Sequence, residues 1–245
     1  MQLLLGYIFS PIYYLAFGLT LAVFQPIQMI SRKLGGYKAH TRSVKILNHF
    51  LINIMYIMGV RMRFEGREFL PKDRPIIVVA NHQSLFDIQA YGHIFRKYDP
   101  KFVAKIELSK GIPSISYNLR HGGSALIDRA NGGQSIREII RLGRFIEENN
   151  YAACIYAEGT RNPSGIVQKF QSAGVKSMLK VAPSAVVVPF VIKGHSDMLK
   201  KGNFPLLFGV KLTYKALPPI EPKDRSAASI VEECEMLIKK ELGQA

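Results

Sequence analysis

The stretch PIIVVANHQSLFD, residues 75–87, decides how the rest of the chain is understood. Its first half holds four consecutive β-branched residues, Ile76 to Val79, which is typical of a strand buried on both faces of a sheet. Its second half, from Asn81 onward, is polar and lies where the strand gives way to a helix. In α/β proteins that is the position at which ligands bind and chemistry occurs. The stretch therefore predicts an α/β fold with a functional site beside residue 82.

His82 and Asp87 are the two residues of this stretch that can carry proton transfer. Ser84 is a suitable N-cap, so we expect a helix over residues 85–96. Within one helix, a separation of five residues would turn the two side chains roughly 140° apart. If His82 instead lies on the turn before the helix, it can fold back against Asp87, and the carboxylate then leaves the other ring nitrogen free as a base. The competing interpretation is that Ser84 and Asp87 form only a capping box.

Composition indicates one large globular domain and an anionic partner. The chain has 245 residues, of which 48% are hydrophobic and 21% are charged, values that exclude a disordered protein. The formal net charge is +15. Such an excess of positive charge favours phosphorylated metabolites, nucleic acid or acidic lipid headgroups as partners.

The cysteines and histidines predict neither a disulfide framework nor a metal site. Cys154 lies in an apolar strand-like run and Cys234 in a helical pattern, and their spacing matches no metal-binding motif. The histidines include no H-E-x-x-H arrangement and no Cys/His cluster. They occupy positions 40, 49, 82, 93, 121 and 195. We therefore expect no bound metal. No cofactor is expected either.

The N-terminal segment predicts contact with a membrane. Residues 1–31 contain no charged side chain, and the run from Ile12 to Phe24, with its flanks, approaches the ~20 apolar residues that cross a bilayer. Basic residues begin at Arg32, and residues 46–60 form a shorter amphipathic pattern. Two structures fit equally well. One is a helical pair lying in the bilayer interface, and the other is a transmembrane anchor followed by a surface helix.

From residue 61 onward, short apolar runs alternate with helical patterns, which predicts a mixed, largely parallel sheet of about seven strands covered by helices. We accordingly divide the chain into a membrane-associated helical segment, 1–60, and an α/β domain, 61–245. The expected strands are 61–64, 76–80, 101–104, 123–127, 152–157, 185–192 and 210–215. The expected helices are 85–96, 115–119, 135–148, 175–181 and 226–242.

Three further polar clusters follow predicted strands. Glu158-Gly159-Thr160-Arg161 comes after residues 152–157, Arg129 comes after 123–127, and Lys105 comes after 101–104. If these strands are parallel, their carboxyl ends meet at one edge of the sheet. Lys105, Arg129 and Arg161 would then form a basic pocket for a phosphate. Taken singly, Arg129 or Arg161 is more often a solvated surface residue or a structural ion pair with Asp128 or Glu158.

Four sequence blocks carry a resemblance to a known family. They are NHQSLFD at 81–87, GGSALIDR ending at Arg129, EGTR at 158–161 and VVVP at 186–189. Together, and in this order, they resemble the 1-acyl-glycerol-3-phosphate acyltransferase family. The resemblance covers roughly residues 55–220, and the apolar N-terminus is similar to the two-helix membrane segment of bacterial members.

The resemblance implies an activity and a role for each candidate residue. His82 would be the general base that takes the proton from the acceptor hydroxyl, and Asp87 would orient it. Lys105, Arg129 and Arg161 would hold the acceptor phosphate, and Glu158, Gly159 and Thr160 would shape that site. The acyl group would pass from acyl-CoA or acyl-carrier protein to 1-acyl-glycerol-3-phosphate, giving phosphatidic acid. The resemblance places the protein at the cytoplasmic face of a bacterial inner membrane.

One departure from the family pattern keeps other functions open. After EGTR the family shows a Phe-Lys pair, whereas this chain has Phe170-Gln171, with glycine displaced to Gly174. Lys169 or Lys176 could replace the missing lysine. The acceptor could instead be a lyso-ornithine or lyso-glycine lipid, or the chain could be a non-catalytic module that binds anionic membranes. Nucleic-acid binding is disfavoured, because no basic patch with interleaved aromatic residues is found.

Overall fold

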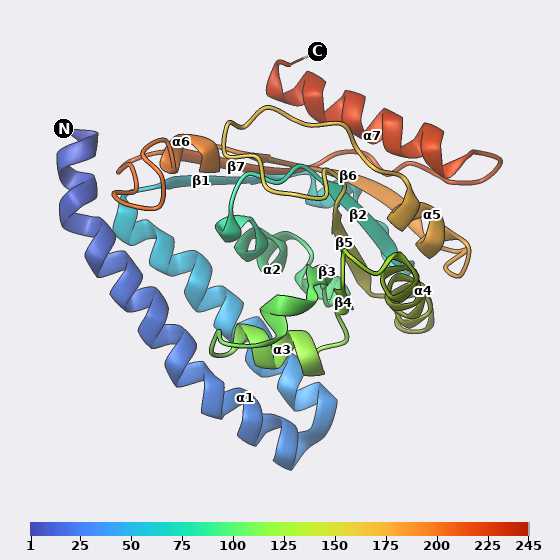
Figure 1. Cartoon of the computed structure of the whole chain (residues 1–245), viewed down its shortest axis with the longest axis horizontal. Coiled ribbons are helices and arrows are strands. Elements are labelled where there is room, and N and C mark those ends of the chain that lie inside the picture. The colour runs from blue at the N-terminus through green and yellow to red at the C-terminus, as the bar shows by residue number, and fades with distance from the viewer. Residues whose placement is uncertain (245) are drawn as a thin grey trace.

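The structure, a computed structural model that describes residues 1–244, has a seven-stranded mixed sheet between two layers of helices (Figure 1). The strands are β1 Arg61–Glu65, β2 Ile76–Ala80, β3 Lys101–Lys105, β4 Ala125–Ile127, β5 Ala152–Tyr156, β6 Val186–Lys193 and β7 Lys211–Ala216. The α-helices are α1 Gln2–Ile54, α2 Tyr91–Ile94, α3 Ile115–His121, α4 Gly132–Asn149, α5 Ala173–Leu179, α6 His195–Met198 and α7 Ala227–Leu242. Short 3₁₀ helices span Met55–Met58, Arg67–Phe69, Leu85–Ala90, Arg96–Tyr98 and Ile106–Ser109.

The sheet order is β1-β7-β6-β2-β5-β3-β4. All neighbouring strands are parallel except β6 and β7, which are antiparallel. The predicted fold class is thus confirmed. The strand β2 is central and buried along its whole length, which agrees with its continuous β-branched sequence. Its carboxyl end at Ala80 lies level with Tyr156 of β5 and Phe190 of β6, so the segments that follow these three strands meet at one edge.

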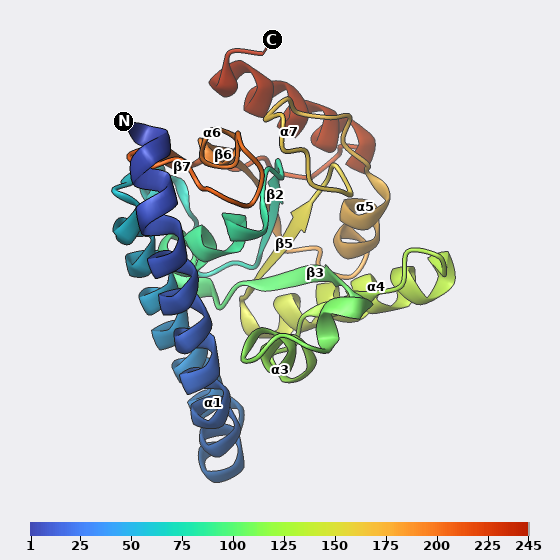
Figure 2. The ribbon, with the colours of Figure 1, turned by 60° about the vertical axis from the view of Figure 1, so that its left-hand side comes forward.

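Alternate side chains of β2 enter two separate cores. Ile76 and Val78 pack into the core under α1 and α2, whereas Ile77 and Val79 pack into the core under α4, α5 and α7. Figure 2 shows the two helical layers on opposite sides of the sheet. Each fully buried aliphatic side chain contributes about 1.5–3 kcal/mol relative to exposure. Buried side chains on both faces therefore hold the sheet rigidly, and the residues at its carboxyl edge have fixed positions.

The N-terminal helix α1 is folded back on itself at Gly36. That residue has φ 63° and ψ −154° inside the helical run, a backbone conformation that glycine adopts without strain. The two arms pack against each other through Leu21, Phe24, Leu47 and Leu51. Figure 1 shows the resulting hairpin beside the domain.

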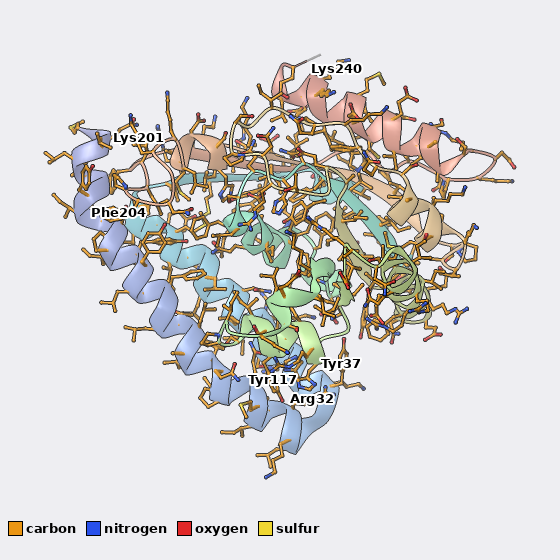
Figure 3. The ribbon with its side chains drawn as sticks, in the orientation of Figure 1. Arg32, Tyr37, Tyr117, Lys201, Phe204 and Lys240 are labelled. Atoms are coloured by element: carbon orange, nitrogen blue, oxygen red, sulfur yellow. The ribbon has the colours of Figure 1, made fainter. Side chains whose placement is uncertain are left out.

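The hairpin is attached to the domain at both ends. Near the turn, Tyr37 donates a hydrogen bond to the carbonyl of Gly122 at 3.0 Å, and Figure 3 shows Arg32, Tyr37 and Tyr117 gathered there. Near the N-terminus, the amide of Leu206 donates to the hydroxyl of Ser10 at 2.9 Å. The described chain has one helix with the length and apolar character to span a membrane, Gln2–Met58.

Two sequence-based expectations changed in detail. The helix expected at 85–96 begins as the 3₁₀ helix Leu85–Ala90 and continues as the four-residue helix α2. The short helix α6 after β6 was not expected. In the other elements, the ends lie within a few residues of the predicted positions.

Candidate active site

The turn after β2 is fixed by the side chain of Asn81. Its amide nitrogen donates to the carbonyl of Ile192 at 2.8 Å, and its oxygen accepts from the amide of Ile192 at 2.9 Å. Asn81 is buried, so both polar atoms of the amide are satisfied where water does not reach. The side chain ties the end of β2 to β6 and sets the point at which the chain turns toward His82.

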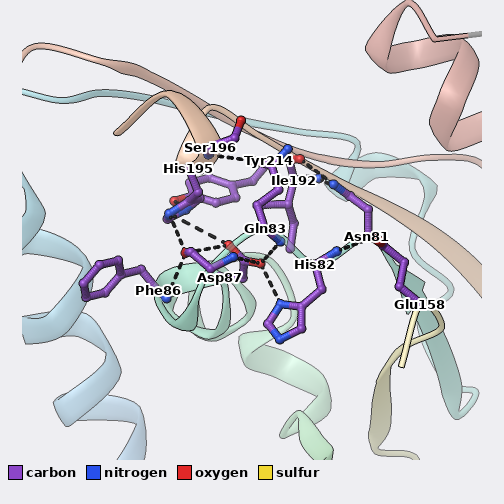
Figure 4. Close-up of polar contacts among 11 residues, drawn as sticks. Asn81, His82, Gln83, Phe86, Asp87, Glu158, Ile192, His195, Ser196 and Tyr214 are labelled. Atoms are coloured by element: carbon purple, nitrogen blue, oxygen red, sulfur yellow. Dashed lines mark hydrogen bonds and ion pairs between the residues drawn. The ribbon is translucent and has the colours of Figure 1, made fainter. Parts of the chain in front are cut away.

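His82 and Asp87 meet, as the sequence predicted (Figure 4). The His82 Nδ1 lies 2.8 Å from Asp87 Oδ2. The His82 side chain is 15% exposed and Asp87 is fully buried. The ring of Tyr156, from β5, stacks on the imidazole with centroids 3.7 Å apart and planes 9° apart. The carboxylate therefore occupies one ring nitrogen, and Nε2 has no hydrogen-bond partner among residues 1–244.

Asp87 is at the same time a helix-capping residue. Its Oδ2 accepts from the amides of Gln83 at 2.7 Å and Ser84 at 3.0 Å, and its Oδ1 accepts from the Ser84 hydroxyl at 3.0 Å. The capping box is complete. The capping box is therefore present, but it is not the whole role of Asp87, because the same carboxylate also holds the imidazole.

The charge of Asp87 is stabilised in spite of its burial. Burial alone raises the pKa of a carboxyl group, but the hydrogen bond from His82, the histidines at 195 and 82, and the Ser84 amide together hold the pKa of Asp87 below its ordinary value of 3.8. The group is therefore a carboxylate at neutral pH, as the orientation of a basic imidazole requires.

Glu158 supports this turn from the end of β5. Its Oε1 accepts from the amide of His82 at 2.8 Å, and its Oε2 accepts from the amide of Gln168 at 3.2 Å. Burial raises the pKa of Glu158 above its ordinary value, although these two amides oppose the rise. The carboxylate thus joins the backbone of His82 to the loop that carries Arg161. Gly159, with φ 73°, makes the turn out of β5, and Thr160 is exposed.

The three predicted cations lie at the same edge as His82. Lys105 ends β3 and is paired with Ile127, two residues before Arg129. Arg161 precedes Asn162, whose amide donates to the carbonyl of His82 at 2.8 Å. All three cations are exposed. Within residues 1–244 none of them forms an ion pair, so the structural ion pairs with Glu158 or Asp128 that the sequence left open are not formed.

The segment that departs from the family pattern is built into the scaffold. The amide of Gln171 donates to the carbonyl of Ala157 at 2.8 Å, while its side chain is exposed. Lys169 and Lys176 are also exposed. A β-carbon on Gly174 would lie 2.5 Å from Ile155 Cδ1, so the displaced glycine lets α5 pack closely on β5.

Three residues of the site were not found from the sequence. Tyr156 covers His82, and His195 and Tyr214 lie behind Asp87, where His195 Nδ1 is 3.1 Å from Ser84 Oγ and His195 Nε2 is 2.7 Å from the Tyr214 hydroxyl. No motif marks any of them. The single available signal was the polar residue His195 directly after a long apolar strand, which is the same pattern that identified His82.

Comparison with known proteins places these blocks in a family. The family model described as Acyltransferase matches residues 61–193. The 1-acyl-sn-glycerol-3-phosphate acyltransferases alpha of Ovis aries and Homo sapiens are each 25% identical over 181 residues, covering 74% of this chain and 61% and 62% of theirs. A probable 1-acyl-sn-glycerol-3-phosphate acyltransferase of Mycoplasma genitalium is 30% identical over 163 residues, covering 64% of this chain and 58% of its own.

A solved structure has the same architecture. The crystal structure of the 1-acyl-sn-glycerophosphate (LPA) acyltransferase PlsC from Thermotoga maritima matches with a TM-score of 0.79 at 22% identity, covering 100% of this chain and 98% of that one. At this identity the likeness establishes the fold alone. The present chain matches about three fifths of the length of the curated relatives, and its matched segment contains the His82 turn, the Arg129 strand and the Glu158–Arg161 loop. The chain belongs to the acyltransferase family.

Proposed function

We propose that this protein transfers a fatty acyl group from acyl-CoA or acyl-carrier protein to the free hydroxyl of 1-acyl-glycerol-3-phosphate, which yields phosphatidic acid. The observation that carries the proposal is the His82–Asp87 pair, with Nδ1 held at 2.8 Å and Nε2 free at the carboxyl edge of the sheet. The names of the relatives, which are 1-acyl-sn-glycerol-3-phosphate acyltransferases, support the choice of acceptor.

The proposed mechanism uses His82 as a base and then as an acid. The Nε2 of His82 takes the proton from the acceptor hydroxyl as its oxygen attacks the thioester carbonyl. When the tetrahedral intermediate collapses, the C–S bond breaks and His82 returns the proton to the departing thiolate. Asp87 stabilises the imidazolium between the two steps, and the electron-rich face of Tyr156, 3.7 Å away, adds to that stabilisation. The chemistry is carried by side chains of this chain, without a metal or cofactor.

The exposed cations at the same edge suit the acceptor phosphate. Arg161 is one residue from the segment that bonds to the His82 carbonyl, so a phosphate held there leaves the glycerol hydroxyl within reach of the imidazole. An arginine can bind two phosphate oxygens at once, and Arg129 and Lys105 add charge. The formal net charge of +15 also favours acidic acyl donors.

We propose that the α1 hairpin lies in the membrane interface at the cytoplasmic face. One side of its first arm is covered by the protein, since Tyr13, Leu21 and Phe24 are buried. The opposite side carries an exposed apolar stripe at helical spacing. The stripe consists of Leu4, Ile8, Ile12, Leu15, Leu19, Val23, Ile27, Ile30 and Leu34. An arm with one face packed on its own domain suits an interfacial helix better than a membrane-spanning anchor. Replacing Leu15 and Leu19 with glutamine is expected to release the protein from anionic vesicles in a flotation assay.

A second acceptor class is favoured by Gln171. This residue stands where the family has lysine, and its side chain is exposed, so an acceptor site that includes this position would have one cation fewer. A lyso-ornithine or lyso-glycine lipid carries less negative charge on its headgroup than a phosphate monoester and would need less compensation.

The decisive experiment is a lipid-product assay with purified protein and a panel of lysolipids, run beside His82→Ala. We expect phosphatidic acid from 1-acyl-glycerol-3-phosphate with the wild type and almost none with the variant. Activity on the aminolipids alone would replace the phosphatidic-acid proposal with the second one. Wild-type product formation by His82→Ala would remove His82 as the base, whereas a wild type that forms no product from any lysolipid would favour the non-catalytic, membrane-binding module.

A further inference from the structure

A second histidine lies directly behind the proposed catalytic pair. His195 is the first residue of α6 and follows Gly194, whose φ of 100° turns the chain out of β6. Its side chain is completely buried. Its two ring nitrogens face two different polar side chains, with Nδ1 3.1 Å from Ser84 Oγ and Nε2 2.7 Å from the Tyr214 hydroxyl. Figure 4 shows His195 and Tyr214 on the side of Asp87 away from His82.

The two oxygens of Asp87 are served from opposite sides. Oδ2 accepts from His82 Nδ1 and from the amides of Gln83 and Ser84. Oδ1 accepts from the Ser84 hydroxyl and lies 3.8 Å from His195 Nδ1. Whether Oδ1 accepts a hydrogen bond thus depends on which way the single hydrogen of the Ser84 hydroxyl points.

The donors and acceptors around Ser84 Oγ determine the direction of that hydrogen. Ser84 Oγ accepts from the amide of Phe86 at 3.0 Å. If its own hydrogen goes to Asp87, its remaining lone pair must accept from His195, so the proton of the neutral ring is on Nδ1. Nε2 then has a lone pair, which accepts the Tyr214 hydroxyl hydrogen. In the opposite arrangement, Ser84 would donate to His195 and Asp87 Oδ1 would lose its closest donor inside a dry interior.

Burial agrees with a neutral ring. Desolvation lowers the pKa of His195 below its ordinary value of 6.5, and the nearby charge of His82 acts in the same direction, while Asp87 opposes both. Burial likewise keeps the pKa of Tyr214 well above its ordinary value. At neutral pH the His195 ring is therefore uncharged, with one N–H, and Tyr214 keeps its hydroxyl hydrogen.

We propose that His195 and Tyr214 are positioning residues of the acyl transfer. They orient the Ser84 hydroxyl toward Asp87, and the hydrogen bond that it donates helps to keep the carboxylate in contact with His82. The hydrogen bonds run in one direction, from Tyr214 to His195, from His195 to Ser84 and from Ser84 to Asp87. Neither residue touches the reacting atoms. The inference rests on the proposed function, because it assigns these residues to the support of the same His82 base.

The kinetic test separates the hydrogen bonds from the packing. His195→Leu keeps bulk but removes the donor to Ser84, and we expect kcat to fall about tenfold, the effect of one lost buried hydrogen bond, with KM for the acceptor unchanged. His195→Asn places an amide nitrogen near the position of Nδ1 and should restore most of kcat. Tyr214→Phe removes one oxygen atom, and its kcat should fall less than that of His195→Leu.

Asp197→Ala serves as the matched control, because Asp197 is an exposed residue of the same short helix, and it should leave kcat unchanged. The inference is overturned if His195→Leu keeps wild-type kcat. It is also overturned if His195→Asn is as slow as His195→Leu, since the role of the residue would then be packing alone.

Nitrogen NMR of the histidine rings tests the same chain of bonds without any turnover. In the wild type, His195 should carry its proton on Nδ1 and keep it across pH 6.5–8, and Tyr214→Phe should weaken that preference. An active wild type with His195 protonated on Nε2 overturns this inference and leaves the proposed function standing. A wild type that is inactive on every lysolipid, with His195 protonated on Nδ1, overturns the proposed function and supports the hydrogen-bond order.

Discussion

At the carboxyl edge of the sheet, Asp87 is completely buried and accepts hydrogen bonds on both oxygens. Arg161, which leaves the same edge one strand away, is exposed, and within residues 1–244 it has no ion-pair partner. The group that would orient the base is therefore set by the fold before any substrate arrives. The groups that would bind the phosphate are left to be ordered by the substrate itself. Chemistry and recognition at this edge thus rest on different degrees of preorganisation.

The largest effect should come from removing the base. His82→Ala is expected to lower kcat by about 10²–10⁴, the usual contribution of a general base. Its thermal unfolding should change little, since the His82 side chain is partly exposed and its backbone contacts to Glu158 and Asn162 remain. Single-turnover kinetics and calorimetry measure the two quantities. Wild-type turnover in this variant would show that the residue oriented by Asp87 is not the base.

Asp87→Ala should lower activity by about 10²-fold or more and, unlike His82→Ala, should also destabilise the protein. The amides of Gln83 and Ser84 and the Ser84 hydroxyl would all lose their acceptor in a buried site, at ~1–3 kcal/mol for each unsatisfied group. Denaturant unfolding measures the loss. Asp87→Asn keeps the volume and one accepting oxygen, so it should recover much of the stability while remaining slow. Equal stabilities for His82→Ala and Asp87→Ala would contradict the conclusion that the fold itself fixes the position of Asp87.

Arg161→Ala should act on binding. We expect KM for the phosphorylated acceptor to rise about tenfold, the effect of losing one charge-assisted hydrogen bond, with a smaller change in kcat. Stability should stay within about 0.5 kcal/mol, because the side chain is an exposed surface group. Lys180→Ala is the matched control, since Lys180 is an exposed cation between α5 and the amino end of β6. A fall in kcat without a change in KM would place Arg161 in the chemical step instead.

The smallest effect concerns the pH dependence of stability. Because burial lowers the pKa of His195 below 6.5, the unfolded chain binds a proton there that the folded chain does not. Stability is therefore lost as pH falls below 6.5, with a slope of at most ~1.4 kcal/mol per pH unit for one histidine. His40, His93 and His121, whose pKa values are also lowered by burial, add to the slope in both proteins. Chemical unfolding at several pH values should show a shallower fall for His195→Asn, and parallel curves would contradict the assignment.

The stability contributed by Asp87 belongs to a separate and more acidic window. Its pKa in the folded protein lies below 3.8, so this contribution is complete above that pH and is lost as pH falls through the lower folded value. The two windows do not overlap at mildly acidic pH, where the histidines lower stability as pH falls and Glu158, whose pKa is raised by burial, acts in the opposite direction.

The sequence was sufficient for the parts of the fold that rest on local pattern. The β-branched run Ile76–Val79 lies in the central strand, which has the predicted bounds. The His82–Asp87 contact could be predicted because the two residues are five positions apart, with a single turn between them. The α-helix expected from residue 85 instead begins as the 3₁₀ helix Leu85–Ala90, although Ser84 and Asp87 form a complete capping box.

The residues behind Asp87 could not be predicted, because they depend on strand order. His195 and Tyr214 are separated by 19 positions and meet because β7 lies antiparallel beside β6, an arrangement that strand–helix alternation does not specify. The three cations were assigned to one edge correctly, since parallel strands alone determine that edge. Their roles in binding stay predictions.

The backbone of β2 leaves the sheet after Ala80, but the side-chain carboxamide of Asn81 continues the hydrogen bonding to β6. It supplies Ile192 of β6 with both a donor and an acceptor beyond the last residue of β2. An aspartate at position 81 would set a second acceptor against the Ile192 carbonyl, so even this near-isosteric change would separate the two strands locally. The Ile192 amide proton should therefore exchange slowly when the turn is intact and quickly when it is not. The hydrogen-exchange rate of this amide therefore reports, without any substrate, whether the turn at the site is formed.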